Sequence, residues 1–271
     1  MDPNPDFLNF PPKALAFDVF GTVNWRDTVT NKLIQSAASK TLSSSASLTP
    51  AARNRASPLT DEDWAQFAEE WRKSYYHFVV TFVPGKSEWR DIDTHHYLSL
   101  IDLLKKWGIE GLYSDDEVRE LSLIWHFLDP WKDSSAGIHA LGKKFLTSTL
   151  SNGNHSLLKD LQEHGNLGFK MLQSSGDFKA YKPHPSVYKG AAEKMGFKTE
   201  EVAMVAAHLR DLKAARGCGM KTIYVERKQE EAWKTDSEEY EDAKTWVDLW
   251  VKEDEDGFLE VARRLGINGG D

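Results

Sequence analysis

The strand-like segments of this chain are distributed unevenly. Residues 14–20 form an apolar run with one Asp in its middle, which is typical of a buried strand. Helical spacing dominates the region that follows, whereas strand-like and helix-like segments alternate after about residue 132. Such alternation is typical of a parallel, doubly wound sheet. The sequence therefore predicts an α/β core, made of residues 1–24 and 132–271, with a helical domain inserted at residues 25–131.

The expected strands of the second half are short and apolar, and each is followed by a turn or helix signal. They are residues 143–150, 168–175, 201–207 and 220–226.

Helical periodicity is clearest at residues 60–80 of the inserted region. Thr60 is expected to cap this helix, and acidic residues follow in its first turn. Further helices are expected at residues 94–107 and 114–127, whereas residues 39–58, rich in Ser and Ala, are expected to form a surface loop. The apolar face of the first helix is predicted to comprise Trp64, Phe67, Ala68, Trp71, Tyr75, Phe78 and Val79.

The charge and composition of the chain limit the classes of molecule that it is expected to bind. The chain has 271 residues, with 34 basic and 42 acidic side chains and a formal net charge of −8, which gives no support to nucleic-acid binding. A small anionic substrate would therefore need a locally positive site. No apolar stretch is long enough to span a membrane, and the acidic N-terminus is unlike a signal peptide. The single cysteine, Cys218, excludes an internal disulfide and suits a reducing compartment, so a cytoplasmic location is expected.

Four polar stretches are predicted to follow strands of the parallel sheet. They are residues 18–22, residues 151–154, the loop around Lys182, and residues 206–211. Ligands of open parallel sheets bind beyond the carboxyl ends of the strands. The topology therefore predicts that these four stretches converge on one site.

Each of these stretches permits a structural and a chemical interpretation. Asp18 is either a turn residue before Gly21 or a nucleophilic carboxylate at a strand end. Ser151 and Asn152 either cap the helix that follows or help its first amides to hold an anion.

Lys182, Asp211 and His208 also leave two interpretations open. Lys182, in a segment stiffened by prolines, is either solvated or held near a carboxylate that it keeps ionised. Asp211 is either a first-turn acid of a helix or a carboxylate that pairs with Lys182 or orients a water molecule. His208 is either a base or a hydrogen-bonded residue at a helix start.

The four stretches, in this order, resemble the haloacid dehalogenase superfamily. The matching motifs are D-x-F-G-T at residues 18–22, S-N-G at residues 151–153, K-P-x-P at residues 182–185, and the acid Asp211. The resemblance implies a Rossmann-like, doubly wound parallel sheet with an inserted helical cap domain.

Two positions depart from the phosphatases that make up most of that superfamily. Those enzymes carry D-x-D and a further metal-binding acid, but here the corresponding residues are Phe20 and Ala207. Phe20 cannot transfer a proton, and magnesium requires several hard oxygen ligands. The sequence instead resembles the L-2-haloacid dehalogenases, whose halide leaving group needs no proton, so neither a metal nor a cofactor is expected.

This resemblance implies a mechanism for short (S)-2-haloalkanoic acids. Asp18 would displace the halide and form an ester, which water would hydrolyse to a 2-hydroxy acid. Asp211 would place Lys182 or the hydrolytic water. The implied substrate-binding residues are Phe20 and Tyr188, which line the site, Thr22, Ser151 and Lys182, which hold the carboxylates, and Arg72 and Asn152, which receive the halide.

One departure concerns the hydrolytic step. The branch usually has Ser and Asn before its last Asp, where this chain has Ala206 and His208. His208 would then position the water or act as a base. The alternatives to a dehalogenase are a related hydrolase, such as a phosphatase, and a catalytically idle member that binds a metabolite or partner. Since members are often dimers, the resemblance also implies a homodimer.

Overall fold

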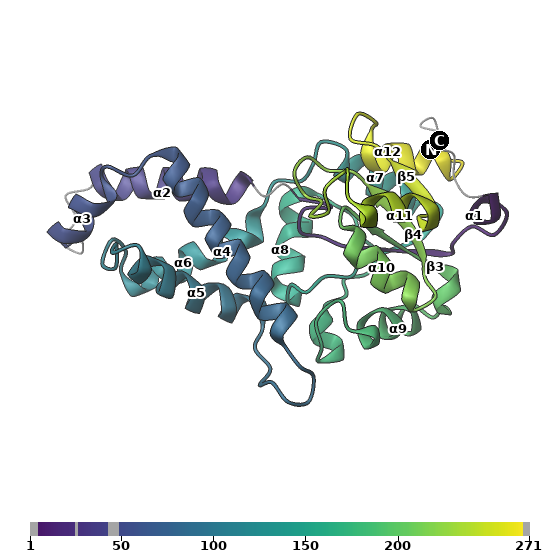
Figure 1. Cartoon of the computed structure of the whole chain (residues 1–271), viewed down its shortest axis with the longest axis horizontal. Helices are drawn as coiled ribbons and strands as arrows, with labels where there is room; N and C mark the ends of the chain where they lie inside the picture. The colour runs from purple at the N-terminus through teal and green to yellow at the C-terminus, as the bar shows by residue number, and fades with distance from the viewer. Residues whose placement is uncertain (1–4, 25–26, 43–48, 268–271) are drawn as a thin grey trace. The chain divides into compact units, whose positions relative to one another are not determined.

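A computed structural model describes residues 5–24, 27–42 and 49–267 of the chain. The fold divides into two compact units. The core unit comprises Met1–Trp25 and Asp129–Asp271, and the helical unit comprises Arg26–Leu128 (Figure 1). None of the helices within the described ranges is long and apolar enough to cross a membrane.

The core unit is built on a five-stranded parallel sheet in the order β2-β1-β3-β4-β5. Its strands are β1 (Ala14–Phe17), β2 (Leu146–Thr149), β3 (Val202–Ala206), β4 (Lys221–Val225) and β5 (Leu249–Val251). The predicted α/β class and parallel sheet are confirmed, and the first strand pairs on both sides with strands from beyond the inserted helices.

Helices pack on both faces of this sheet (Figure 1). The core-unit helices are α1 (Pro5–Asn9), α7 (Ser134–Gly142), α8 (His155–Gly165), α9 (Pro185–Lys194), α10 (Leu209–Gly217), α11 (Glu238–Trp246) and α12 (Gly257–Arg264), with short 3-10 helices η2 (Ser175–Phe178) and η3 (Thr199–Glu201).

Successive residues of β1 contact opposite layers because side chains alternate along a strand. Ala14 and Ala16 belong to a buried cluster with residues of α9, α10 and α11. Phe17 points to the other layer, where its ring centroid lies 5.3 Å from those of both Phe169 and Phe258. Both faces of β1 are therefore buried, which explains its continuous apolar sequence.

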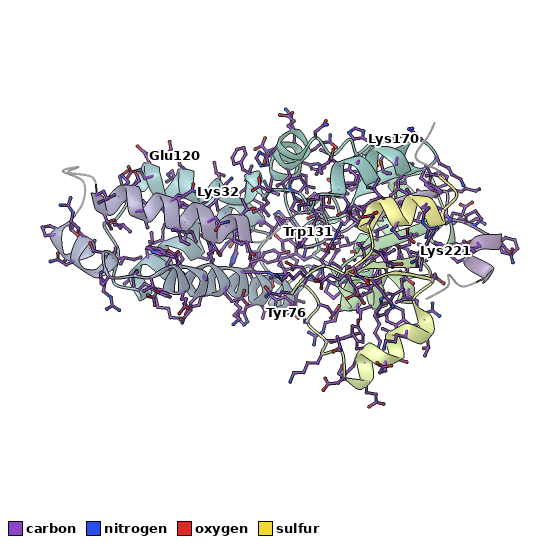
Figure 2. The ribbon with its side chains drawn as sticks, turned by 90° about the horizontal axis from the view of Figure 1, so that it is seen from above. Lys32, Tyr76, Glu120, Trp131, Lys170 and Lys221 are labelled. Carbon is purple, nitrogen blue, oxygen red and sulfur yellow. The ribbon has the colours of Figure 1, made fainter. Side chains whose placement is uncertain are left out.

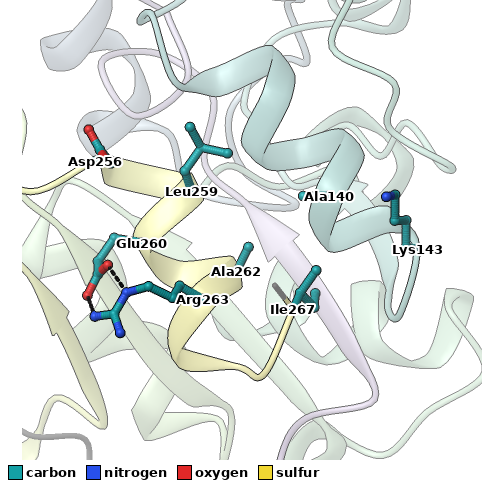
Figure 3. Close-up of a pocket in the computed structure, with 8 residues that line it drawn as sticks. All are labelled: Ala140, Lys143, Asp256, Leu259, Glu260, Ala262, Arg263 and Ile267. Carbon is teal, nitrogen blue, oxygen red and sulfur yellow. Dashed lines mark hydrogen bonds and ion pairs between the residues drawn. The ribbon is translucent and has the colours of Figure 1, made fainter. Parts of the chain in front are cut away.

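Helices α7 and α12 approach closely on the Phe17 side of the sheet. A Cβ atom at Gly137 would lie 2.4 Å from Cβ of Phe258, so only glycine permits this packing. A pocket between the two helices is lined by Ala140 and Leu259, and Arg263 at its edge donates from Nε to Glu260 at 2.6 Å (Figure 3). Ala140 lies in α7, the helix that leads into the start of β2. The pocket is therefore on the side of the strand starts and away from the carboxyl ends of the strands.

The strands of the core unit differ from the sequence predictions at two places. Residues 168–175 form only isolated bridges, because the amide of Gln173 donates to the Thr149 hydroxyl at 2.8 Å instead of joining a strand ladder. The short strand β5 was not predicted, since three residues are too few to show a period.

The helical unit contains the predicted long amphipathic helix. Its helices are α2 (Asp27–Leu42), α3 (Pro50–Ala56), α4 (Asp61–Thr81), α5 (Ile92–Lys106) and α6 (Asp115–Ser122), followed by the 3-10 helix η1 (Leu123–Phe127). Thr60 and Asp63 form a capping box at the start of α4. The predicted apolar face of α4 is buried except at Tyr75 and Phe78, which are half-buried.

The predicted loop at residues 39–58 is wrong in part. Helix α2 extends to Leu42, and α3 begins at Pro50 behind a Thr49 cap whose hydroxyl accepts from the Ala52 amide at 3.2 Å. Proline at the first helical position favours this start. Residues 43–48 of the expected loop lie outside the described residues.

Candidate active site

The register of the sheet brings three chain segments together at its carboxyl edge. Phe17 of β1 pairs with Thr149 of β2 and with Val205 of β3. Asp18, Ser151 and His208 follow these positions within a few residues. The fourth segment, around Lys182, lies between η2 and α9 and therefore does not follow a strand, contrary to the prediction.

Lys182 joins the two acids expected at this edge. Its Nζ atom lies 2.6 Å from Oδ1 of Asp18 and 2.7 Å from Oδ2 of Asp211. Tyr188 of α9, which is completely buried, donates its hydroxyl to Oδ1 of Asp211 at 2.5 Å. Asp18 and Lys182 are only 7% and 8% exposed, so this ion pair is shielded from water.

The burial of these groups and their mutual charges act in opposite directions on their pKa values. Burial by itself would raise the pKa of Asp18, but the charges and hydrogen bonds of Lys182 and His208 hold it well below its usual range. Burial would lower the pKa of Lys182, but Asp18 and Asp211 raise it above its usual value. Asp18 and Lys182 are therefore both ionised in neutral solution. Burial and the Asp211 charge raise the pKa of Tyr188, which remains a neutral hydrogen-bond donor.

Thr22 connects Asp18 to the end of β3. Its hydroxyl donates to Oδ2 of Asp18 at 2.7 Å and accepts from the Ala207 amide at 2.9 Å. Gly21 makes the turn between them with a φ of +79°, in the region that favours glycine. Trp131, labelled in Figure 2, donates its indole N–H to the Gly21 carbonyl at 3.0 Å. The turn after β1 is therefore held at several points.

His208 lies at the start of α10, but its side chain does not cap that helix. Nδ1 lies 3.0 Å from Oδ2 of Asp18, and Nε2 lies 3.7 Å from Oε2 of Glu230. Burial would lower the pKa of His208, but the hydrogen bonds and charges of Asp18 and Glu230 raise it to about 10. The imidazole is therefore positively charged in neutral solution, with a carboxylate on each side.

The segment after β2 holds the Lys182 loop in place. Oδ1 of Asn152 accepts from the Lys182 backbone amide at 2.8 Å and from the Ser175 hydroxyl at 2.7 Å. Ser151 is buried, and its Oγ accepts from the Gly153 amide at 3.1 Å. Phe20 is half-buried near this turn, since a Cβ atom at Gly153 would lie 3.3 Å from its Cε2.

Residues after β4 also contact the site, although they were not predicted from the sequence. The buried Arg227 donates from Nε to the Thr22 carbonyl at 3.0 Å and forms a bidentate pair with Asp133 at 2.7 and 2.8 Å. Oε2 of Glu231 accepts from the Leu209 amide, the first of α10, at 2.7 Å. Arg227 directly follows a predicted strand, residues 220–226, so the rule that identified the other stretches would also have found it, whereas Glu231 lies farther along the loop.

Arg72 belongs to the helical unit. It lies on α4 beside the completely buried Trp71 and is itself half-buried. Its expected contact with a departing halide stays a prediction.

The residues at the carboxyl edge do not suit a magnesium ion. Asp18 and Asp211 each pair with the Lys182 ammonium, and the side chains of Phe20 and Ala207 offer no oxygen ligand. Within the described ranges, no group of three or more His, Cys, Asp or Glu side chains is placed to hold a metal ion.

Comparison with known proteins identifies sequence relatives. The family described as haloacid dehalogenase-like hydrolase matches residues 12–219. (S)-2-haloacid dehalogenase 1 of a Pseudomonas species is 32% identical over 127 residues, covering 46% of this chain and 55% of that enzyme. The (S)-2-haloacid dehalogenase of Pseudomonas putida is 30% identical over 121 residues, covering 43% and 53%. The chain thus spans about half the length of the curated relatives it matches.

Solved structures align over more of the chain. A defluorinating L-2-haloacid dehalogenase superposes with a TM-score of 0.76 and 28% identity, covering 94% of this chain and 95% of that protein. Another L-2-haloacid dehalogenase gives a TM-score of 0.72 and 30% identity, covering 94% and 100%.

Proposed function

This chain belongs to the haloacid dehalogenase-like hydrolase family, and we propose that it hydrolyses short (S)-2-haloalkanoic acids to 2-hydroxy acids without a metal. The observation that carries this proposal is the buried, ionised Asp18 at the end of β1, with Phe20 two residues later. A carboxylate in that position can attack a carbon atom, and Phe20 cannot protonate a leaving group as an acid at that position would. A halide needs no such proton.

In the first step, a carboxylate oxygen of Asp18 bonds to C2 of the substrate. The carbon–halogen bond breaks, the halide leaves with its electron pair, and C2 is inverted. Lys182 supports this step because it keeps Asp18 ionised at neutral pH. Lys182, Thr22 and Ser151 are the proposed partners of the substrate and nucleophile carboxylates.

In the second step, water attacks the carbonyl carbon of the ester on Asp18 and releases the 2-hydroxy acid. Asp211 is the proposed base for this water. The hydroxyl of Tyr188 and the ammonium of Lys182 hold its two carboxylate oxygens, so its position is defined.

The remaining assignments are part of the same proposal. Asn152 and Arg72 receive the halide, and Phe20 and Tyr188 line the substrate site. The helical region, residues 25–131, acts as a cap on the core formed by residues 1–24 and 132–271. The assembly is a homodimer, and the location is cytoplasmic, in agreement with the single Cys218.

Halide release from separated enantiomers tests the proposal. The chain is incubated with each enantiomer of 2-chloropropionate and 2-bromopropionate in the presence of a chelator. We expect halide release from the S enantiomers only, and none from the Asp18→Asn variant. Asp236→Asn, a matched change at an exposed residue, serves as the control and should keep full activity.

Two results would contradict this function. Hydrolysis of a phosphate ester that requires added magnesium, with no halide release, would identify a phosphatase. Inactivity on both substrate classes by a chain with an intact far-UV circular dichroism spectrum would indicate a binding protein.

A further inference from the structure

Asp18, His208 and Glu230 form a continuous row of charged groups at the carboxyl edge of the core unit. The imidazole of His208 lies 3.0 Å from Oδ2 of Asp18 through Nδ1 and 3.7 Å from Oε2 of Glu230 through Nε2. The side chain of Glu230 is completely buried, and that of His208 is 27% exposed. Glu230 comes from the segment after β4 and takes no part in the two reaction steps proposed above.

The two oxygens of Asp18 have different surroundings. Among the described residues, Oδ1 accepts a hydrogen bond from the Lys182 ammonium at 2.6 Å. Oδ2 accepts two, from the Thr22 hydroxyl at 2.7 Å and from His208 at 3.0 Å. Since Thr22 and His208 are both directed at Oδ2, Oδ1 is the oxygen left to attack the substrate. Oδ2 would then become the carbonyl oxygen of the ester.

Two donors directed at one carbonyl oxygen form the arrangement of an oxyanion hole. We propose that the His208 imidazolium and the Thr22 hydroxyl stabilise the negative charge that develops on Oδ2 when water attacks the Asp18 ester, and that Glu230 is a positioning residue that keeps His208 protonated. This inference rests on the dehalogenase function proposed above.

The charged groups around His208 favour an imidazole that stays protonated in both the resting and the ester state. Asp18 faces it from the segment after β1 and Glu230 from the segment after β4, and the Lys182 ammonium lies on the far side of Asp18. Esterification removes the charge of Asp18, but the buried carboxylate of Glu230 remains. A buried carboxylate stabilises a neighbouring cation strongly, because water screens the interaction only weakly. The imidazolium therefore persists in the ester state.

The water oxygen bonds to Cγ of Asp18, the carbonyl π electrons move to Oδ2, and one water proton moves to Asp211. The oxyanion then collapses, the bond from Cγ to the former Oδ1 breaks, and the departing alkoxide takes the proton from Asp211. The second water proton is lost to solvent when Asp18 ionises again. His208 remains protonated throughout.

An oxyanion-stabilising His208 and a basic His208 would change the rate of ester breakdown with pH in opposite directions. An oxyanion-stabilising imidazolium loses its effect when it is deprotonated, so ester breakdown should slow as the pH rises through the pKa of His208. A basic imidazole would make ester breakdown faster over the same range. The pH dependence of this single step therefore separates the two roles.

Single-turnover kinetics with (S)-2-bromopropionate measures the step. Halide release reports ester formation, and mass spectrometry after acid quenching reports the ester on Asp18. In His208→Ala we expect a halide burst followed by ester breakdown slowed about 10²–10³-fold, the usual cost of removing one oxyanion-hole donor. His208→Gln, which keeps a neutral donor, should recover part of this loss.

Glu230→Gln tests the positioning role. In this variant, we expect the rate of ester breakdown to begin falling with rising pH at a lower pH than in the unmodified chain. The matched control is Glu226→Gln, a carboxylate of the same segment that accepts from Tyr240 and Trp250 instead of His208, and its decline should not move. Nitrogen chemical shifts of the His208 ring in the resting enzyme, measured by NMR, should show an imidazolium at pH 7 and an earlier titration in Glu230→Gln.

Each contrary result has a distinct meaning. Unchanged ester breakdown in His208→Ala, or a rate that rises with pH through the His208 titration, would overturn the oxyanion role. A neutral ring at pH 7, or identical titrations in both glutamate variants, would overturn the role of Glu230. No halide burst in the unmodified chain would refute the dehalogenase function itself, and the inference with it.

Discussion

Replacing Lys182 with methionine should destabilise the core unit more than most single substitutions. Methionine keeps a side chain of similar length but leaves Asp18 and Asp211 without the ammonium that lies 2.6 and 2.7 Å from them. At an effective dielectric constant of about 20, each such pair gains roughly 6 kcal/mol of Coulomb energy. Much of that gain offsets the desolvation of the ions, and breaking a buried pair has a net cost of about 3–5 kcal/mol. We expect Lys182→Met to lower the free energy of unfolding by about that amount.

The loss should depend on pH in a defined way. The folded-state pKa of Asp18 is lowered, so its contribution to stability is present above the unfolded value of about 3.9 and disappears as the pH falls through the folded value. The folded-state pKa of Lys182 is raised, so its contribution is present below about 10.4 and disappears as the pH rises through the folded value. The difference between the two chains should therefore be largest from about pH 5 to about pH 9.

The difference in the free energy of unfolding between the unmodified chain and Lys182→Met is measured by urea denaturation followed by circular dichroism. Hydrogen exchange of the strand amides reports on the core unit. Lys182→Met combined with Asp211→Asn should recover part of the loss, because only one buried carboxylate then lacks its partner. A loss below about 1 kcal/mol, or a loss that is the same at pH 3 and pH 7, would refute the reasoning, because the two acids would then be solvated without Lys182.

Two further predictions concern packing and capping. Gly137→Ala should destabilise the core unit by about 1–3 kcal/mol, because its Cβ would overlap Phe258, and the strand amides should exchange faster with solvent; unchanged exchange would show that α7 can move away from α12. Thr60→Ala should lower the free energy of unfolding of the helical unit by about 0.5–2 kcal/mol, because it removes the acceptor for the Asp63 amide. The loss is measured as a lower urea midpoint. Thr60→Ser, which keeps the acceptor, should show little change.

The parts of the fold that repeat a pattern could be predicted from the sequence. Strand β1 is apolar at consecutive positions because both of its faces are buried, and α4 shows helical spacing because only one side of it is buried. The bridges at residues 168–175 and the strand β5 could not be predicted, because a side-chain hydroxyl replaces a ladder bond in the first case and the second is very short.

The same limit applies to the candidate site. A strand-end rule selects Asp18 and His208 because parallel strands end at a common edge. It cannot select Glu230, which lies five residues beyond the end of β4 and reaches His208 only through the path of its loop. Nor could it decide between the two interpretations of His208, since the charge of an imidazole depends on which carboxylates lie beside it.

The sequence by itself determined the α/β class, the acid at the end of the first strand, and the apolar Phe20 two residues after that acid. These are local properties, since they depend on residue type and on spacing along the chain. Only the tertiary structure decided that Lys182 lies between Asp18 and Asp211, and that His208 has a carboxylate on each side. Charge interactions depend on distance in space, and residues 18, 182, 208, 211 and 230 are brought within a few ångströms by the sheet and its loops.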